Sequence, residues 1–236
     1  MGSDHVLVER RGQVLVVHLD DSKANALSTS MIAAIGEAID AAEADETVGA
    51  VVLHGRAGRF CAGFDLSVMR GGDIGAMAAL VCDGGALVHR LYGAKVPLVA
   101  ACTGHALAAG ALLLLACDVR VGADVDCKIG LNEVAIGMVL PDWAITIAVD
   151  RLSRRHIQLA VATARITSAG GAVDAGFLDE VVDADAVLDT AVQRAEALAE
   201  LDRGAYAATV RCLRGAVLRT MAMQVEVDRV AASGLS

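Results

Sequence analysis

The sequence predicts a protein of the α/β class with a helical C-terminal part. Strand-like and helix-like segments alternate from about residue 5 to about residue 130. Such alternation favours parallel strand pairing in a sheet that helices cover. From about residue 142 onward the pattern is mainly helical. The chain is 56% hydrophobic but only 3% aromatic, which suits close packing through small side chains. Since no Pro-rich or Ser-rich linker separates the two parts, we expect a core over residues 1–185 and a helical region over residues 186–236.

The first elements follow from the hydrophobic period. Apolar runs over residues 5–9 and 13–19 flank the turn "RRG" and predict a hairpin. Ser28 can cap a helix that runs to about residue 44, because apolar side chains recur there at helical spacing. The stretch "VGAVVLHG", residues 48–55, predicts a buried strand by its continuous β-branched content.

Glycine and proline separate the elements of the middle third. The glycine-rich stretch "GRAGRFCAGFDL" (55–66) is expected to be a loop. We then expect a helix within residues 73–93, a strand at "PLVAAC" (97–102), a helix at about 107–116 and a strand at "DVRVGA" (118–123). Further helices are expected from about residue 142, from Ser153, and on to the end of the chain.

One segment has the composition of a membrane span. Residues 96–117 carry no formal charge and are long enough to cross a bilayer. Pro97, Gly104 and His105 interrupt the segment, and Pro with Gly is typical of turns between elements. We therefore expect a buried strand, a turn and a buried helix here, and no membrane span.

Charge and cysteine content limit the functional classes. The net charge of −9 excludes an extended basic surface for nucleic acid, and "RLSRRH" (151–156) supplies only a small basic patch. The six cysteines form no CxxC pair and have no metal-like histidine spacing. Reduced thiols, a cytoplasmic location and the absence of a metal are the resulting expectations.

Two glycine-containing turns can present backbone N–H groups to a ligand. In "FCAGFDL", Gly63 can adopt a backbone angle that turns a neighbouring N–H inward, although an ordinary strand-to-helix turn also explains it. In "TGHALAAGALLLLACD", the helix after Gly104 begins with unpaired N–H groups, and small Ala109 and Gly110 allow close approach. Two such groups from separate loops would form an oxyanion hole.

A single charge stands in the stretch "GLNEVAIGMVLP" (130–141). An unpaired carboxylate in apolar surroundings is costly, because removing it from water takes several kcal/mol unless it finds partners or a proton. Glu133 therefore either faces water from one side of a loop or has a function that requires a buried acid.

Together, four motifs in order resemble the crotonase (enoyl-CoA hydratase/isomerase) superfamily. They are "NALS" (25–28), "RFCAGFDL" (59–66), "TGHALAAGALLLLACDVRV" (103–121) and "GLNEVAIGMVLP" (130–141), within a resemblance over roughly residues 5–185. The resemblance implies a spiral of ββα units that assembles as a homotrimer or hexamer. It also implies an acyl-CoA thioester whose carbonyl oxygen accepts from the N–H groups of Phe64 and Ala109. Ala109 stands in place of a family glycine, and it keeps its N–H.

The resemblance also implies where coenzyme A binds. Ala24, Ala62, Asp65 and Leu66 match positions that cradle the adenine, mainly through backbone atoms. Coenzyme A enters as part of the thioester substrate, so no separate cofactor is expected.

One carboxylate distinguishes the possible reactions. Hydratases of the family use two glutamates, and the chain carries Leu112 at the position of the first and Glu133 at that of the second. Moving a double bond from position 3 to position 2 needs only one acid/base, so an enoyl-CoA isomerase is favoured. An enoyl-CoA hydratase of fatty-acid metabolism and a non-catalytic acyl-CoA binder remain alternatives.

Two further residues follow the Glu133 loop. Asp142 is expected either at the substrate site as a second acid or at a helix N-terminus, where it would satisfy free N–H groups. Trp143, the only tryptophan, either lines the acyl pocket or packs in the core.

Overall fold

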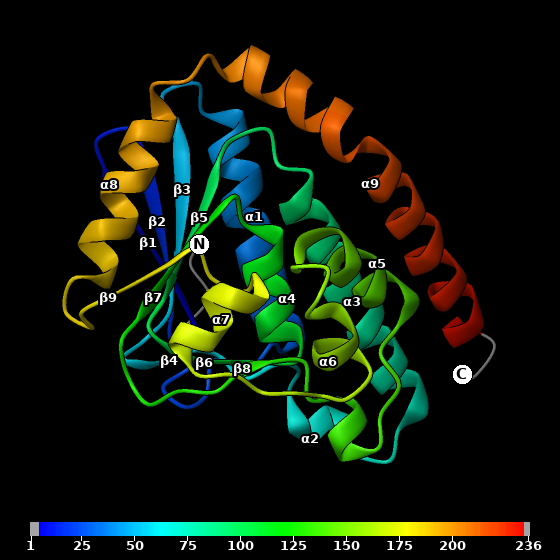
Figure 1. Cartoon of the computed structure of the whole chain (residues 1–236). Helices are drawn as coiled ribbons and strands as arrows, with labels where there is room; N and C mark the ends of the chain where they lie inside the picture. The colour runs from blue at the N-terminus through cyan, green and yellow to red at the C-terminus, as the bar shows by residue number, and fades with distance from the viewer. Residues whose placement is uncertain (1–4, 234–236) are drawn as a thin grey trace.

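A computed structural model describes residues 5–233 and shows a six-stranded sheet with helices on both faces (Figure 1). The strand order is β1-β2-β3-β5-β7-β9. The first two strands form the expected antiparallel hairpin, and every other pairing in this sheet is parallel. The strands are β1 (Val6–Arg11), β2 (Val14–Leu19), β3 (Ala50–His54), β5 (Leu98–Cys102), β7 (Val119–Ala123) and β9 (Glu180–Val182).

A second, three-stranded parallel sheet lies at one end of the first (Figure 1). Its strands are β4 (Gly58–Cys61), β6 (Gly104–Leu107) and β8 (Ile129–Gly130). Each follows directly on a strand of the large sheet, and each leads into a helical segment. The chain thus repeats a strand–strand–helix unit, which confirms the ββα spiral.

The helices begin where the sequence provides caps. α1 (Thr29–Ala44) starts after Ser28, whose hydroxyl accepts from the N–H of Met31. α3 (Ile74–Tyr92) starts after Asp73, whose carboxylate accepts from the N–H of Ala76. α4 (Ala109–Ala116) is different, because all eight of its residues are buried and no side chain caps it. Its first N–H groups are therefore free for another partner.

Two hydrophobic cores cover the two faces of the large sheet. The main core joins the sheet to α1, α3, α4 and α5 (Asp142–Arg151). The second core lies under α8 (Val187–Ala199), which packs on the opposite face (Figure 1). α8 falls within the helical region expected over residues 186–236, yet it packs directly on the strands. Only the last helix, α9 (Arg203–Ser233), lies beyond the sheet, along α3 and α5.

Asp118 ties the C-terminal helix to the core. One of its oxygens accepts from the N–H of Leu98 and from the hydroxyl of Tyr206, both within 2.9 Å. The other pairs with the buried guanidinium of Arg214 at 2.6 Å. Since Tyr206 and Arg214 belong to α9, this network fixes where α9 crosses the molecule.

Several elements differ from the sequence expectations. The stretch 55–66, expected as a loop, contains β4, and the C-terminal part, expected as helices only, contains β9. The helix expected from Ser153 is α6 and begins at Ile157 (Ile157–Val161). The remaining short helices are α2 (Leu66–Met69), α7 (Ala169–Ala175) and a 3-10 turn over Val134–Ile136.

The membrane-like stretch 96–117 folds as β5, β6 and α4, and most of it is buried, as expected. Among the described residues, one helix is long and apolar enough to cross a membrane, namely α3. Residues of α3 belong to the main core, and the helix packs against α1, α4 and α9. We therefore interpret α3 as a core helix.

Candidate active site

A cavity of about 320 Å³ opens between the β4–α2 segment, the start of α4 and the loop that carries Glu133. Its walls are mostly apolar and include the side chains of Phe64, Leu112 and Trp143. Polar side chains enter it at Arg70, Asn132 and Glu133, whereas Ala62 and Leu66 form part of its lining at the surface. The cavity therefore unites several site residues that lie far apart in the sequence.

The first backbone donor is the N–H of Phe64. Residues Leu27 and Phe64 form a parallel bridge, in which the N–H of Leu27 donates to Gly63 and the N–H of Asp65 donates to Leu27. Because these flanking groups make the bridge, the N–H of Phe64 points away from it. Gly63 has a φ of +94°, which an L side chain rarely adopts, and thereby allows the turn.

The second backbone donor is the N–H of Ala109, the first residue of α4. Ala108 precedes it with φ 51° and ψ −126°, a conformation that costs a non-glycine residue on the order of 1–3 kcal/mol. The carbonyl of Ala108 accepts from Ala111 and Leu112, and its N–H donates to Gly130. These three hydrogen bonds hold the strained turn in place, and none of them uses the N–H of Ala109.

Close packing brings the two donors into one region. A methyl group added at Gly63 would lie 3.0 Å from the carbonyl oxygen of Leu107 and 3.5 Å from the nitrogen of Ala109. One added at Gly110 would lie 2.1 Å from the carbonyl oxygen of Cys61. The segments that carry Phe64 and Ala109 are thus in contact, as an oxyanion hole requires.

Glu133 is held at the wall of the cavity by its own loop. Its carbonyl accepts from the N–H groups of Ile136 and Met138, and Gly137 closes the turn with φ 77°. The residue is 9% exposed, and its Oε2 has no hydrogen-bond partner among the described residues. Burial disfavours the charged carboxylate and raises the pKa of Glu133 to about 6.

Two more buried polar atoms belong to residues of the same lining. The Oδ1 of Asn132 and the Nε1 of Trp143 also lack partners within residues 5–233. Buried polar groups are rarely left unpaired, so three on one cavity mark it as a place that binds polar groups. The indole of Trp143 also packs tightly against Gly85 of α3, so the residue serves both the cavity and the core.

Leu112 lines the cavity three residues after Ala109, at the start of α4. Among the described residues that line the cavity, Glu133 is the only carboxylic acid, and Arg70 is the only other group that carries charge. An apolar side chain therefore occupies the position that the sequence resemblance assigns to a second carboxylate.

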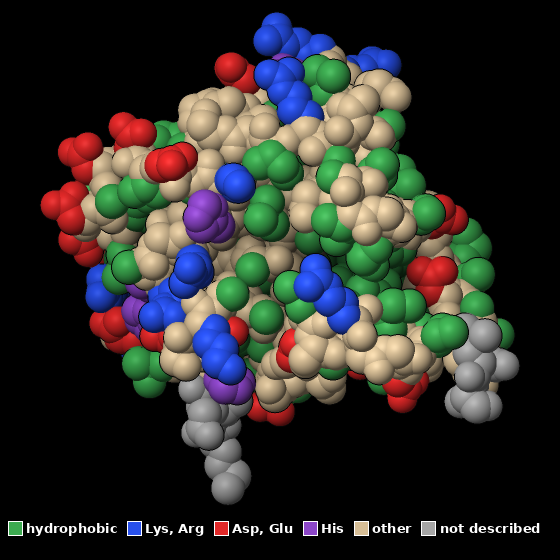
Figure 2. Space-filling view, turned by 90° about the horizontal axis from the view of Figure 1, so that it is seen from below, with side chains coloured by type: hydrophobic (Ala, Val, Ile, Leu, Met, Phe, Trp, Pro, Cys, Tyr) green, Lys and Arg blue, Asp and Glu red, His purple; other side chains and the backbone are tan. Residues whose placement is uncertain are grey.

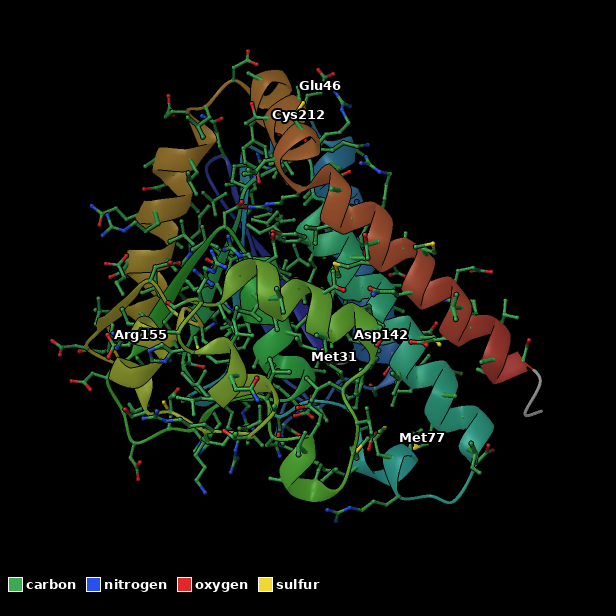
Figure 3. All side chains as sticks on the ribbon, turned by 45° about the vertical axis from the view of Figure 1, so that its right-hand side comes forward. Met31, Glu46, Met77, Asp142, Arg155 and Cys212 are labelled. Atoms are coloured by element: carbon green, nitrogen blue, oxygen red, sulfur yellow. The ribbon has the colours of Figure 1, made fainter. Side chains whose placement is uncertain are left out.

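Five expected site residues lie outside the cavity lining, and Ala109 is one of them, although its neighbour Ala108 lines the cavity. Asp142 is exposed and is the first residue of α5, which is the helix N-terminus that was one of its two expected places (Figure 3). Its charge acts on Asp228 of α9. Asp65 instead caps α2 by accepting from Ser67. Gly110 faces Cys61, and the carbonyl of Ala24 accepts from the N–H of Ala62.

Sequence reasoning missed Asn132 and the basic side chains near Ala24. Arg56 and Arg59 donate to the carbonyl of Lys23 at 2.9 and 3.3 Å, which brings three cationic residues together beside Ala24. Figure 2 shows blue Lys and Arg side chains near apolar surface on the face seen from below. The separation of Lys23 from Arg56 and Arg59 in the sequence hid this cationic group, since only the folded chain assembles it.

Comparisons with known proteins identify relatives by sequence and by overall fold. The sequence profile of the enoyl-CoA hydratase/isomerase family matches residues 9–233. The chain is 34% identical over 186 residues to mitochondrial enoyl-CoA delta isomerase 1 of Mus musculus, covering 77% of this chain and 64% of that protein. It is 35% identical over 198 residues to a putative enoyl-CoA hydratase of Thermus thermophilus, covering 80% and 76%. An apo enoyl-CoA isomerase structure from Mycobacterium tuberculosis superposes with a TM-score of 0.91 at 36% identity, covering 96% and 98%.

Proposed function

The chain belongs to the enoyl-CoA hydratase/isomerase family, and we propose that it moves the double bond of an enoyl-CoA thioester from position 3 to position 2. The observation that carries the proposal is that Glu133 is the only carboxylate among the described residues of the cavity lining, which it shares with the apolar side chain of Leu112. One acid/base suffices for a proton shuttle, whereas addition of water needs a second group to hold the water.

The proposed reaction has two proton transfers. Glu133 removes a proton from C2, and the resulting enolate oxygen accepts from the N–H groups of Phe64 and Ala109. The same glutamic acid then delivers the proton to C4, and the double bond ends between C2 and C3. A pKa of about 6 suits both steps, because Glu133 is ionised at neutral pH and its acid form still releases the proton readily.

Coenzyme A binds, in this proposal, at the end of the cavity near Ala24. The adenine would lie against the backbone of Ala24, Ala62, Asp65 and Leu66. Arg56, Arg59 and Lys23 gather beside this strip and offer positive charge for the phosphates of coenzyme A. The otherwise acidic chain thus has cations where an anionic substrate enters.

A hydratase is the second candidate. Asn132 is next to Glu133, and its unpaired buried oxygen could accept a hydrogen bond from a water molecule. A non-catalytic binder is less favoured, because holding an acyl group needs no buried carboxylate whose ionisation is costly. Purified protein supplied with 3-octenoyl-CoA should form conjugated 2-octenoyl-CoA, which can be followed by its ultraviolet absorbance. If 2-octenoyl-CoA does not form, the proposal is refuted.

Replacing Leu112 by Glu should create hydratase activity at a cost in stability. The second carboxylate would enter the cavity near Glu133, where two close acids disfavour joint ionisation and one would titrate at higher pH. An unpaired polar group on this buried helix face should lower the free energy of unfolding by about 1–3 kcal/mol. Rates on 2-octenoyl-CoA and urea unfolding measure both effects, with Leu112→Gln as the uncharged control. Equal hydration by the Gln variant would show that the second carboxylate is not what hydration lacks.

We further propose a cytoplasmic homotrimer or hexamer. Support comes from exposed apolar side chains along α9, namely Leu213, Met223, Val227 and Val230, and from six free cysteines with no disulfide among the described residues. Sedimentation at micromolar concentration should give a mass of three or six chains, and a monomer would contradict the assembly.

A further inference from the structure

Two adjacent glycines, Gly84 and Gly85, lie near the middle of α3. Both are buried, and the helix continues through them without a break. Glycine is less favourable than alanine inside a helix, because it loses more backbone freedom on folding. Two glycines in succession therefore weaken α3, unless the neighbours of the helix need the space that a side chain would fill.

Each of the two glycines leaves room for one aromatic ring of the active-site cavity. A methyl group added at Gly84 would lie 2.3 Å from Cε1 and 2.5 Å from Cζ of Phe64. One added at Gly85 would lie 2.8 Å from Cε2 and 2.9 Å from Nε1 of Trp143. Both rings belong to residues that line the cavity. Side chains do not approach one another this closely, so the two rings pack directly against the backbone of α3.

The contact at Gly84 affects the oxyanion donor, because the ring and the donor N–H belong to the same residue. The backbone of Phe64 is held by its bridge with Leu27, and its ring is held by α3. If the ring had to leave α3, the side chain would turn toward the cavity or the backbone would shift with it. The first change would fill the space of the acyl carbons, and the second would move the N–H.

We propose that Gly84 is a positioning residue, which fixes the N–H of Phe64 by letting the phenyl ring pack against α3. The inference rests on the proposed function, in which this N–H binds the thioester oxygen. Gly85 has a different role. Its space is shared by Trp143 of α5 and by Val225 of α9, which lies 3.0 Å from the added methyl group. Neither of these residues carries an oxyanion donor, so Gly85 serves the packing of three helices.

Gly84→Ala should lower kcat on 3-octenoyl-CoA by about tenfold or more, because complete loss of one oxyanion donor costs about 10² to 10³ and a displaced donor is partly lost. Octanoyl-CoA with a heavy carbon isotope at C1 reports on the oxyanion hole without turnover. Hydrogen bonds to a carbonyl oxygen lower its infrared stretching frequency, so the bound thioester should lose part of this shift in Gly84→Ala. A residue that only stabilises the fold would not change the frequency.

Two other glycines of α3 serve as controls. Gly85→Ala also crowds a ring, and it should lower the urea midpoint while keeping the wild-type carbonyl frequency. Gly75→Ala should keep both kcat and the frequency, because among the described residues its methyl group would meet only the Oδ1 of Asp73, at an ordinary distance of 3.4 Å. If Gly84→Ala keeps the wild-type frequency, or if Gly85→Ala shifts the frequency equally, Gly84 has only a packing role.

Shortening Phe64 provides a test that does not depend on a stable Gly84→Ala protein. Phe64→Leu keeps the backbone N–H and ends the side chain at the δ carbons. Cδ1 of Phe64 lies 3.6 Å from a methyl group added at Gly84, which is an ordinary contact. In the Phe64→Leu background, Gly84→Ala should therefore fill the empty space, raise kcat by about threefold or more and restore part of the carbonyl shift.

Two outcomes of this test would overturn the inference. Phe64→Leu with the kcat and carbonyl frequency of the wild type would show that the ring does not position the N–H. A Gly84→Ala substitution that lowers kcat equally in both backgrounds would show that its effect does not pass through Phe64. If the carbonyl frequencies behave as expected but 3-octenoyl-CoA is not isomerised, only the proposed reaction fails.

Discussion

Glu133→Gln should abolish isomerisation while leaving thioester binding nearly unchanged. The amide keeps the shape of the side chain and removes only its basicity. A positioned acid/base is worth about 10² to 10⁴ in rate, so kcat on 3-octenoyl-CoA should fall by that factor. Titration with octanoyl-CoA should give a Kd close to that of the wild type. A variant with full activity would show that another group moves the proton.

The same substitution should stabilise the protein at neutral pH. The pKa of Glu133 is raised from 4.5 to about 6 by burial, so the folded state binds more protons than the unfolded state between these values. The free energy of unfolding therefore falls as the pH rises through this window, by about 2 kcal/mol in total. Glu133→Gln removes this loss and should unfold at higher urea concentration at pH 7. Equal stability of the two proteins at pH 7 would mean that Glu133 is solvated.

The activity of the wild type should rise with pH over the same range in which its stability falls. Glu133 must be ionised to remove the proton from C2, so kcat/KM should decline as the pH falls through about 6. An inflection near the ordinary glutamate value of 4.5 would contradict the buried position of this carboxylate.

Gly110→Ala should damage both the fold and the oxyanion hole. The added methyl group would lie 2.1 Å from the carbonyl oxygen of Cys61 and 2.7 Å from its carbonyl carbon, and backbone atoms must move to admit it. Overpacking of this kind costs about 1–3 kcal/mol or more. The shift would displace the adjacent N–H of Ala109, and loss of one such donor costs about 10² to 10³ in kcat.

Gly36 provides the matched control for this substitution. It lies in α1, and a methyl group there would meet nothing within 4 Å. Gly36→Ala should therefore raise stability by about 0.5–1 kcal/mol through helix propensity alone and leave kcat unchanged. If Gly110→Ala is as stable and as active as Gly36→Ala, the contact between β4 and α4 does not position Ala109.

The parts of the fold that local sequence determines were predictable. Ser28 marked the start of α1, and continuous apolar runs identified β3 and β5. β8 and β9 are too short for a hydrophobic period, and β4 contains few apolar residues. These strands exist because distant segments supply their partners, as in the pairing of β9 with β7. No local pattern reports such pairing.

The candidate site also has features that the local sequence indicates and features that only the folded chain assembles. Glu133 was identifiable because it is an isolated charge among apolar residues, and Gly63 because a tight turn needs it. The apolar wall of the cavity was not identifiable from the sequence, since Met69, Val81 and Met138 have no common spacing and meet only in the folded chain. Of the two placements expected for Asp142, the structure gives the helix N-terminus, because α5 begins at this residue and Asp142 lies outside the cavity lining.

The most direct test of a single-carboxylate shuttle is the ratio of two initial rates for the wild-type protein. One is the isomerisation of 3-octenoyl-CoA, and the other is the hydration of 2-octenoyl-CoA at the same enzyme concentration and pH. With Glu133 as the only acid among the described residues of a cavity that Leu112 keeps apolar, isomerisation should be at least about a hundredfold faster, the low end of what one positioned acid/base contributes. Hydration that is faster than isomerisation would contradict the account.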